Sequence, residues 1–114
     1  MSIIYRILSQ KQWEDALQAG QFDGSEHDLR DGFIHFSTAS QVAETAAKYY
    51  AGLPDLLLLF VDTETLTAPL KWEEARNQQR FPHLYGPLLV STVTQVVSLP
   101  ILPDGRHVFP KELP

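Results

Sequence analysis

The sequence contains no cysteine, and this absence excludes several kinds of chemistry together. The chain can form no disulfide, has no thiolate nucleophile, and cannot hold zinc or an iron–sulfur cluster through sulfur ligands. A chain of this composition suits a reducing compartment.

Positive charge is also scarce. Nine Lys and Arg residues stand against 14 Asp and Glu, which gives a formal net charge of −5. The basic residues are scattered along the chain, whereas binding to the backbone of a nucleic acid draws on clustered Lys and Arg. We expect no extended nucleic-acid surface, although a small local phosphate site is compatible with this charge.

Long apolar runs are absent as well. The longest, Leu56 to Val61, is far too short to cross a bilayer. The segment Met1 to Arg6 lacks the basic region and apolar run of a signal peptide. We therefore expect no membrane partner and a cytoplasmic location. The length predicts one domain over residues 1–114 with a C-terminal tail over 100–114, and it leaves the oligomeric state open.

The first third of the chain predicts a strand, a helix and a loop. Residues 3–8 are rich in β-branched and aromatic side chains, as strands are. Ser9 followed by Gln12 is a capping box that begins a helix, and Gly20 is suited to end it. Residues 21–32 are polar and glycine-containing, which predicts a loop.

A short strand and a second helix are predicted next. In a strand over 33–36, alternation places His35 on the face opposite Ile34 and Phe36. Thr38 and Gln41 repeat the capping pattern and begin a helix that ends near Gly52.

The remaining segments complete an α+β pattern. Residues 56–61 are continuously apolar, which favours a central strand covered on both faces. Residues 81–88 contain two prolines, which forbid a regular helix and disfavour an internal strand, so an ordered loop is predicted. Residues 92–99 alternate as a last strand does. This order predicts a mixed α+β fold with a small, partly antiparallel sheet and two main helices.

His35 is the first candidate for a functional residue. It comes immediately before the helix N-terminus predicted at Ser37 and Thr38, where free backbone N–H groups and the helix dipole favour an anion. Hydroxyl groups beside an imidazole suit a ribose or a phosphate. The structural alternative is that Thr38 only caps the helix while His35 bonds a neighbouring carbonyl group.

His83 and Tyr85 form the second candidate. They are two residues apart, so in an extended segment both side chains point the same way and offer a donor, an acceptor and a ring for stacking. The neighbouring prolines stiffen the segment, as a binding loop requires. The alternative is that Tyr85 is a buried anchor and His83 a solvent-exposed bystander.

Glu73 is a candidate general base beside the large ring of Trp72, although a solvated helix start explains the pattern equally well. No spacing resembles a metal site, because the four histidines are scattered along the chain, so no metal ligands are assigned. A pairing of His35 and His83 in space is left open.

These segments resemble the bacterial domain-of-unknown-function family 952. The resemblance runs from Ile4 to about Leu99, and it is carried by residues 31–38 with Gln41 and Thr45-Ala46, by Leu70-Lys71-Trp72-Glu73, and by residues 81–88. More distantly, Phe33 to Leu66 is similar to the His-Leu-Ser segment, and the helix and strand after it, of the RNA 2′-phosphotransferases. Those enzymes have the ADP-ribosyltransferase fold and use NAD.

The distant resemblance implies a split, mostly antiparallel sheet with a nucleotide-binding groove, and NAD as the cofactor to test. In such a groove His35 contacts a ribose hydroxyl, and Ser37 or Thr38 contacts a phosphate or the nicotinamide side. Tyr5 and Arg6 stand where those enzymes carry a His-Gly pair, and no Glu falls clearly at their third catalytic motif. Without that carboxylate the groove would bind without turnover.

The leading hypothesis is an ADP-ribosyltransferase-like domain that binds a nucleotide or an NAD-like ligand. If it is an enzyme, it transfers an ADP-ribosyl group or removes a ribose-linked phosphate. The catalytic candidates are His35, Glu73 and His83, and the ligand-binding candidates are Ser37, Thr38, Tyr85, Tyr5 and Arg6. One alternative is a catalytically inactive binding or interaction module, and another is a metal-dependent hydrolase that uses His35, His83 and Glu73.

Overall fold

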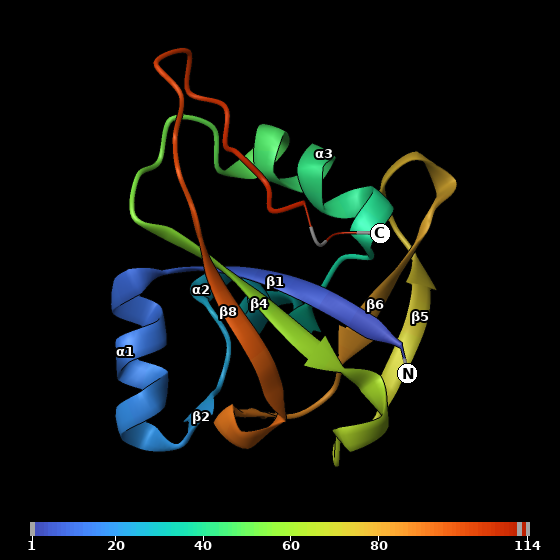
Figure 1. Cartoon of the computed structure of the whole chain (residues 1–114). Coiled ribbons are helices and arrows are strands. Elements are labelled where there is room, and N and C mark those ends of the chain that lie inside the picture. The colour runs from blue at the N-terminus through green and yellow to red at the C-terminus, as the bar shows by residue number, and fades with distance from the viewer. Residues whose placement is uncertain (1, 112, 114) are drawn as a thin grey trace.

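A computed structural model describes residues 2–111 and 113 as three antiparallel sheets and three α-helices (Figure 1). Residues 1, 112 and 114, at the ends of the predicted domain, lie outside the described residues. In chain order the elements are β1 (Ile3–Ser9), α1 (Gln10–Ala19), β2 (Gln21–Phe22), α2 (Glu26–Asp31), β3 (Ile34–His35), α3 (Ala39–Tyr49), β4 (Leu56–Asp62), β5 (Leu70–Glu74), β6 (Arg80–Leu84), β7 (Leu88–Leu89) and β8 (Val93–Leu99).

The strand and helix predicted at the N-terminus form where the capping pattern places them. The Ser9 Oγ accepts a hydrogen bond from the Gln12 N–H at 3.1 Å, and the Gln12 side chain accepts one from the Ser9 N–H at 2.9 Å. Gly20 ends α1 with a φ of 87°, a left-handed conformation that glycine adopts without steric cost. The predicted beginning and end of this helix are confirmed.

The loop predicted over residues 21–32 is wrong, because this stretch forms β2 and the short helix α2. Ser25 begins α2 through a second capping box, in which its Oγ accepts from the Asp28 N–H at 3.2 Å and Asp28 Oδ2 accepts from the Ser25 N–H at 2.7 Å. An aspartate takes the place that glutamate or glutamine usually holds in this motif. The structure therefore has a third, six-residue helix beside the two that were predicted.

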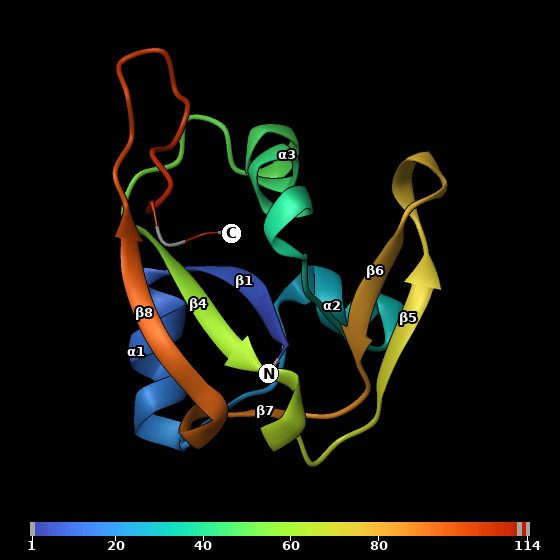
Figure 2. The same ribbon diagram turned by 45° about the vertical axis from the view of Figure 1, so that its right-hand side comes forward.

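The largest sheet has the order β1-β4-β8, and β4 is its central strand. Leu58, Leu59 and Val61 of β4 are fully buried, so this strand is covered on both faces, as its continuous apolar sequence predicted. Figure 2 shows this sheet on one side of the molecule and β5 and β6 on the other, with α3 lying above them.

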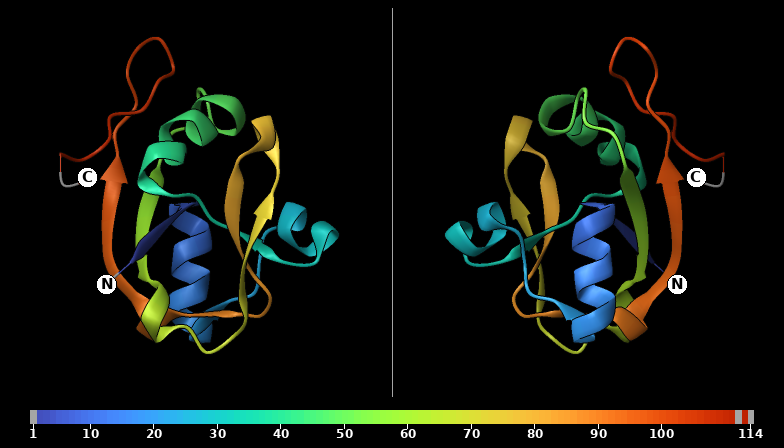
Figure 3. Two further views of the ribbon diagram at one scale, coloured as in Figure 1. Left: turned by 90° about the vertical axis from the view of Figure 1, so that its right-hand side faces the viewer. Right: turned by 90° about the vertical axis from the view of Figure 1, so that its left-hand side faces the viewer.

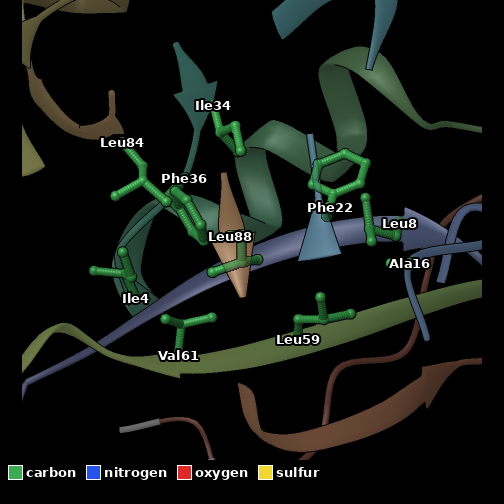
Figure 4. Packing of buried hydrophobic residues seen from close by; sticks show 10 residues of the cluster. All are labelled: Ile4, Leu8, Ala16, Phe22, Ile34, Phe36, Leu59, Val61, Leu84 and Leu88. Carbon is green, nitrogen blue, oxygen red and sulfur yellow. The ribbon is translucent and has the colours of Figure 1, made fainter. Parts of the chain in front are cut away.

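Two apolar clusters cover the two faces of the β1-β4-β8 sheet. On one face Ile4, Leu8, Leu59 and Val61 pack against residues of α1, β2, β3, β6 and β7 (Figure 4). On the other face Ile7, Leu58 and their neighbours pack against Val42 and Ala46 of α3. The sheet is thus the middle layer of the fold.

The second three-stranded sheet has the order β3-β6-β5, which corrects the prediction of a loop from residue 81. Pro82 lies in its central strand and accepts a hydrogen bond from the Phe36 N–H at 3.0 Å. The N–H and C=O of a strand residue point to the same side, so the N–H that Pro82 lacks would face Phe36. Phe36 comes directly after His35, the last residue of β3. The missing hydrogen bond therefore falls at the end of the ladder and not within it.

One backbone bridge joins the two larger sheets. The Tyr5 N–H donates to the Ser37 carbonyl at 2.8 Å, and the Ser37 N–H donates back to the Tyr5 carbonyl at 2.9 Å. Among the described residues the sheets are otherwise separate, and the predicted mixed α+β fold is confirmed. Figure 3 shows α2 on the side of the molecule opposite β8. Within the described part of the chain, no helix has the length and hydrophobicity that crossing a membrane requires.

We expect Gly86→Ala to lower the free energy of unfolding by about 1–3 kcal/mol, the usual cost of overpacking. A Cβ atom at Gly86 would lie 2.6 Å from the Cβ of Ala68, which is closer than two non-bonded carbon atoms can approach. Urea denaturation measures the loss. The double variant Ala68→Gly/Gly86→Ala should recover part of it, and equal destabilisation in single and double variants would contradict this contact.

Candidate functional site

A cleft of about 460 Å³ lies between β1 of the first sheet and the β3–β6 pair of the second, with α2 and α3 at its sides. Its lining combines polar groups with aromatic rings. The polar members are Arg6, Ser25, His27, Asp28, Asp31, His35, Ser37, Thr45 and His83, and the aromatic members are Tyr5, Phe36, Tyr49, Tyr50 and Phe81.

The carboxylate of Asp28 is the centre of the polar lining. It is 2% exposed, and its Oδ1 accepts hydrogen bonds from Arg6 Nη1 at 2.8 Å, from the His35 N–H at 3.1 Å and from His35 Nδ1 at 2.7 Å. Its Oδ2 accepts from the N–H of Ser25 at 2.7 Å and from the Ser25 hydroxyl at 3.0 Å. Both carboxylate oxygens are therefore occupied within the fold.

These contacts keep Asp28 ionised. Burial acts to raise the pKa of its carboxyl group, but the hydrogen bond from His35 and the charge and hydrogen bond of Arg6 outweigh burial and hold the pKa well below its usual range. An ionised carboxylate only accepts hydrogen bonds, so the His35 Nδ1 must carry the proton. Asp28 thus fixes both the orientation and the proton position of the His35 ring.

A second carboxylate holds His83 in the same way. Glu73 Oε1 accepts from His83 Nδ1 at 2.8 Å and from the Tyr85 hydroxyl at 2.6 Å. Two hydrogen bonds lower the pKa of Glu73, and the one from Tyr85 has a larger effect than the one from His83. The bond between Tyr85 and Glu73 also raises the pKa of the Tyr85 hydroxyl. Glu73 is therefore an acceptor, and the Nδ1 of His83 carries its proton.

The two histidines are direct neighbours. His35 on β3 pairs in register with His83 on β6, and their ring centroids are 5.5 Å apart. Phe33 stacks on the His83 ring at 4.0 Å with an interplanar angle of 22°. The sequence left this pairing open, and the structure brings both rings to one cleft with each Nδ1 held by a carboxylate.

The other predicted residues divide into two groups. Ser37, Tyr5 and Arg6 line the cleft, but Arg6 is 7% exposed and its guanidinium is engaged by Asp28 and by the His35 carbonyl at 3.0 Å. Thr38, Glu73 and Tyr85 do not line it. The backbone N–H of Thr38 donates to the Gln41 side chain at 3.0 Å, which is a capping contact.

Sequence reasoning missed His27, Asp28 and Asp31, which all lie in or at the end of α2. His35 Nε2 is 2.9 Å from Asp31 Oδ2, and His27 Nε2 is 3.2 Å from the same oxygen. No metal ligands were expected from the sequence, because the histidines are scattered along it, yet the fold gathers two of them around one carboxylate. The four-residue spacing of His27 and Asp31 was the available signal, and it has meaning only once a helix is recognised there.

A family model described as "Protein of unknown function (DUF952)" matches residues 7–96. The chain belongs to this family. The match covers every element that lines the cleft except the first residues of β1, and it confirms the family resemblance of the sequence.

Three solved structures of one relative, CC0527 from Caulobacter crescentus, share this fold. A crystal structure is 50% identical over 94% of each chain with a TM-score of 0.90, and that of a double mutant is 48% identical over 94% of each chain with a TM-score of 0.90. A solution NMR structure is 51% identical over 93% of this chain and 91% of that one, with a TM-score of 0.82. No curated protein matches the chain.

We expect Asp28→Asn to lower the free energy of unfolding of this DUF952 protein by about 3 kcal/mol, because it leaves the buried Arg6 without its counter-charge. Urea denaturation measures the change. The matched control is Asp15→Asn, which removes an exposed carboxylate that is 59% exposed and bonded to Lys11; it should leave the midpoint unchanged. Equal midpoints for the two variants would contradict the central place of Asp28.

The stability of the protein should fall in acid through Asp28. The pKa of this carboxyl is lower in the folded state than its ordinary value of 3.8, so the unfolded chain binds more protons as the pH falls. Its stabilisation is complete above the ordinary value and is lost below it, at up to about 1.4 kcal/mol per pH unit for one proton. A ¹³C NMR titration checks the cause: the Asp28 carboxyl should remain ionised at pH 3.8, and half-protonation there would contradict the argument.

Proposed function

We propose that the cleft binds a small nucleotide-like ligand, such as NAD, ADP-ribose or a nucleoside phosphate, and that His35 and His83 contact it. The observation that carries the proposal is the pair of neighbouring imidazoles, each held at Nδ1 by a carboxylate and both lining one cleft. The similarity of residues 33–66 to the RNA 2′-phosphotransferases supports the choice of ligand class. The cytoplasmic location expected from the sequence belongs to the same proposal.

The size and lining of the cleft suit such a ligand. Its volume of about 460 Å³ lies in the range of small-molecule sites, which are concave, largely apolar and carry a few placed polar groups. The rings of Tyr49, Tyr50 and Phe81 supply flat surfaces for a base. The hydroxyls of Ser37 and Thr45, 3.1 Å apart, supply polar contacts between the end of β3 and α3.

The charges in the cleft favour the ribose as the part held near α2. Arg6 is the cation of the lining, and Asp28 already engages it. Asp31 is a partly exposed carboxylate beside His35. A carboxylate repels phosphate but accepts hydrogen bonds from ribose hydroxyls, as acidic residues do in dinucleotide sites. The ribose therefore belongs at Asp31 and His35, with the phosphate directed toward Ser37 and His83.

The imidazoles also define the chemistry that an enzyme of this kind would use. His83, whose Nδ1 proton faces Glu73, would present the lone pair of its Nε2, which accepts a proton from an attacking hydroxyl or water. In transfer of an ADP-ribosyl group from NAD, that proton comes from the acceptor as it bonds the ribose carbon and nicotinamide leaves. In removal of a ribose-linked phosphate by water, it comes from the attacking water as the ribose oxygen leaves phosphorus. Glu73 acts in this scheme through His83, as a positioning residue, since it lies outside the cleft lining.

The proposal is tested with His83→Asn, because asparagine keeps a donor near the Nδ1 position for Glu73 and removes Nε2. Titration of ¹⁵N-labelled protein with NAD, ADP-ribose and nucleoside phosphates should shift the amides of residues 33–38. We expect the variant to bind at least about tenfold more weakly, which corresponds to about 1.4 kcal/mol, with a native-like amide spectrum.

The matched control is His107→Asn, because His107 lies outside the cleft and its Nε2 bonds the Leu53 carbonyl at 2.8 Å. This variant should bind as the wild type does. If no compound shifts residues 33–38, the ligand proposal is wrong. If His83→Asn unfolds the protein and His35→Asn binds normally, the two histidines act as structural locks, as in an inactive interaction module.

A further inference from the structure

At the mouth of the cleft, His27, Asp31 and His35 direct three ligand atoms toward one point. Their nitrogen and oxygen atoms all lie within 4.8 Å of one another. The side chains are 50%, 37% and 31% exposed, so an ion has access from solvent. We propose that these three residues bind one Zn²⁺ or a similar first-row divalent ion. This site goes beyond the proposed function and does not depend on it.

The distances fit a tetrahedral ion. Zinc lies 2.0–2.1 Å from histidine nitrogen and 2.0–2.2 Å from carboxylate oxygen, so neighbouring ligand atoms in a tetrahedron are about 3.3 Å apart. Asp31 Oδ2 is 2.9 Å from His35 Nε2 and 3.2 Å from His27 Nε2. The His27 and His35 rings meet edge to face with centroids 4.6 Å apart, and the Nε2 atoms of both lie within 3.2 Å of the same Asp31 oxygen. Small side-chain rotations therefore complete the site.

The surroundings of His35 are those of a metal ligand. Metal-binding histidines almost always donate their second ring nitrogen to a carboxylate or a carbonyl, which fixes the ring and raises its basicity. His35 Nδ1 donates to the buried, ionised Asp28 at 2.7 Å, and Arg6 holds that carboxylate in turn. The Nε2 of His35 is thereby directed toward Asp31 Oδ2, 2.9 Å away, where the ion would lie.

The donor set selects the class of ion. Two imidazoles and one carboxylate suit zinc, cobalt, nickel or copper, whereas magnesium and calcium prefer oxygen ligands throughout. Three protein ligands that all line the cleft leave a fourth position open toward it, as in catalytic zinc sites. The ion would also supply positive charge in a cleft whose arginine is already engaged by Asp28.

Binding requires one rearrangement, and that rearrangement gives a specific signature. Arg30 Nη2 donates to His27 Nδ1 at 3.2 Å, so the His27 proton lies on Nε2 and points at Asp31. A metal at Nε2 displaces this proton to Nδ1 and breaks the contact with Arg30, which is 70% exposed and can move away. His27 should therefore change tautomer on metal binding, while His35 keeps its proton on Nδ1.

The test uses the full chain without a histidine tag, first freed of metal by a chelator and then titrated with ZnCl₂ in the absence of nucleotide. Calorimetry should show one ion per chain. Co²⁺ in place of Zn²⁺ should give the visible absorption of a tetrahedral centre. Imidazole ¹⁵N NMR should show coordination at the Nε2 of His27 and His35, with the tautomer change confined to His27.

His27→Ala and Asp31→Asn should each weaken Zn²⁺ binding by at least about 100-fold, because losing an outer hydrogen-bond partner alone costs 10–100-fold. Both side chains are partly exposed, so both variants should retain the wild-type amide spectrum. The matched controls are His107→Ala and Asp15→Asn, which remove an imidazole and a carboxylate elsewhere and should bind Zn²⁺ as the wild type does.

Three results would overturn the proposal. The first is that the protein binds no single ion saturably, the second is that His27→Ala and Asp31→Asn bind the ion as the wild type does, and the third is that Glu73→Gln loses the ion while those two variants keep it. The last result would place the ion at His83 and Glu73 instead. In each case His27, Asp31 and His35 would serve only to hold one another by hydrogen bonds. The zinc titration contains no nucleotide, so its outcome does not decide whether the cleft binds a nucleotide-like ligand.

Discussion

The carboxylate of Asp28 joins three parts of the fold through hydrogen bonds. It accepts hydrogen bonds from Arg6 on β1, from the backbone and ring of His35 on β3, and from Ser25 at the start of its own helix. A buried charge is tolerated only when its hydrogen-bonding capacity is met. The short helix α2 therefore cannot move without leaving a charge unpaired in the interior, and the position of His35 follows from the position of Asp28.

This constraint explains why so short a helix can form part of a site. Six residues make too few hydrogen bonds to be stable alone in water, so α2 depends on its capping box and on Asp28. Once fixed, it presents His27 and Asp31 on one face, four residues apart, next to the ring of His35. The second sheet brings His83 in register with His35. The cleft is thus built where two sheets diverge, and one buried ion pair holds its geometry.

The sequence predicted most of the fold because its signals were local or periodic. The capping box of Ser9, the glycine at position 20 and the apolar run of β4 each specify structure through their own neighbours. Two errors arose, one where long-range context decided the outcome and one where a local signal was not recognised. Pro82 is tolerated in a central strand because the adjacent strand ends beside it, and α2 was hidden because Ser25 and Asp28 form a capping box in a polar, glycine-containing stretch. His35 and His83 were identified by residue type, but the role of Asp28 could not be, since nothing in the sequence shows that an aspartate at position 28 meets Arg6.

His35 would be shared by the two proposals, and this sharing has a thermodynamic consequence. Its Nδ1 is committed to Asp28, so an ion and a ligand both have to use the Nε2 side of the ring. An ion at Asp31 removes the negative charge that would otherwise repel a phosphate, and its open position can accept a ligand oxygen. A ligand whose oxygen takes that open position would in turn make the ion harder to remove, because coupling between two sites is reciprocal in free energy. A ligand that used His35 only through hydrogen bonds from its ribose would instead compete with the ion, so the sign of the coupling reports which group of the ligand lies at α2.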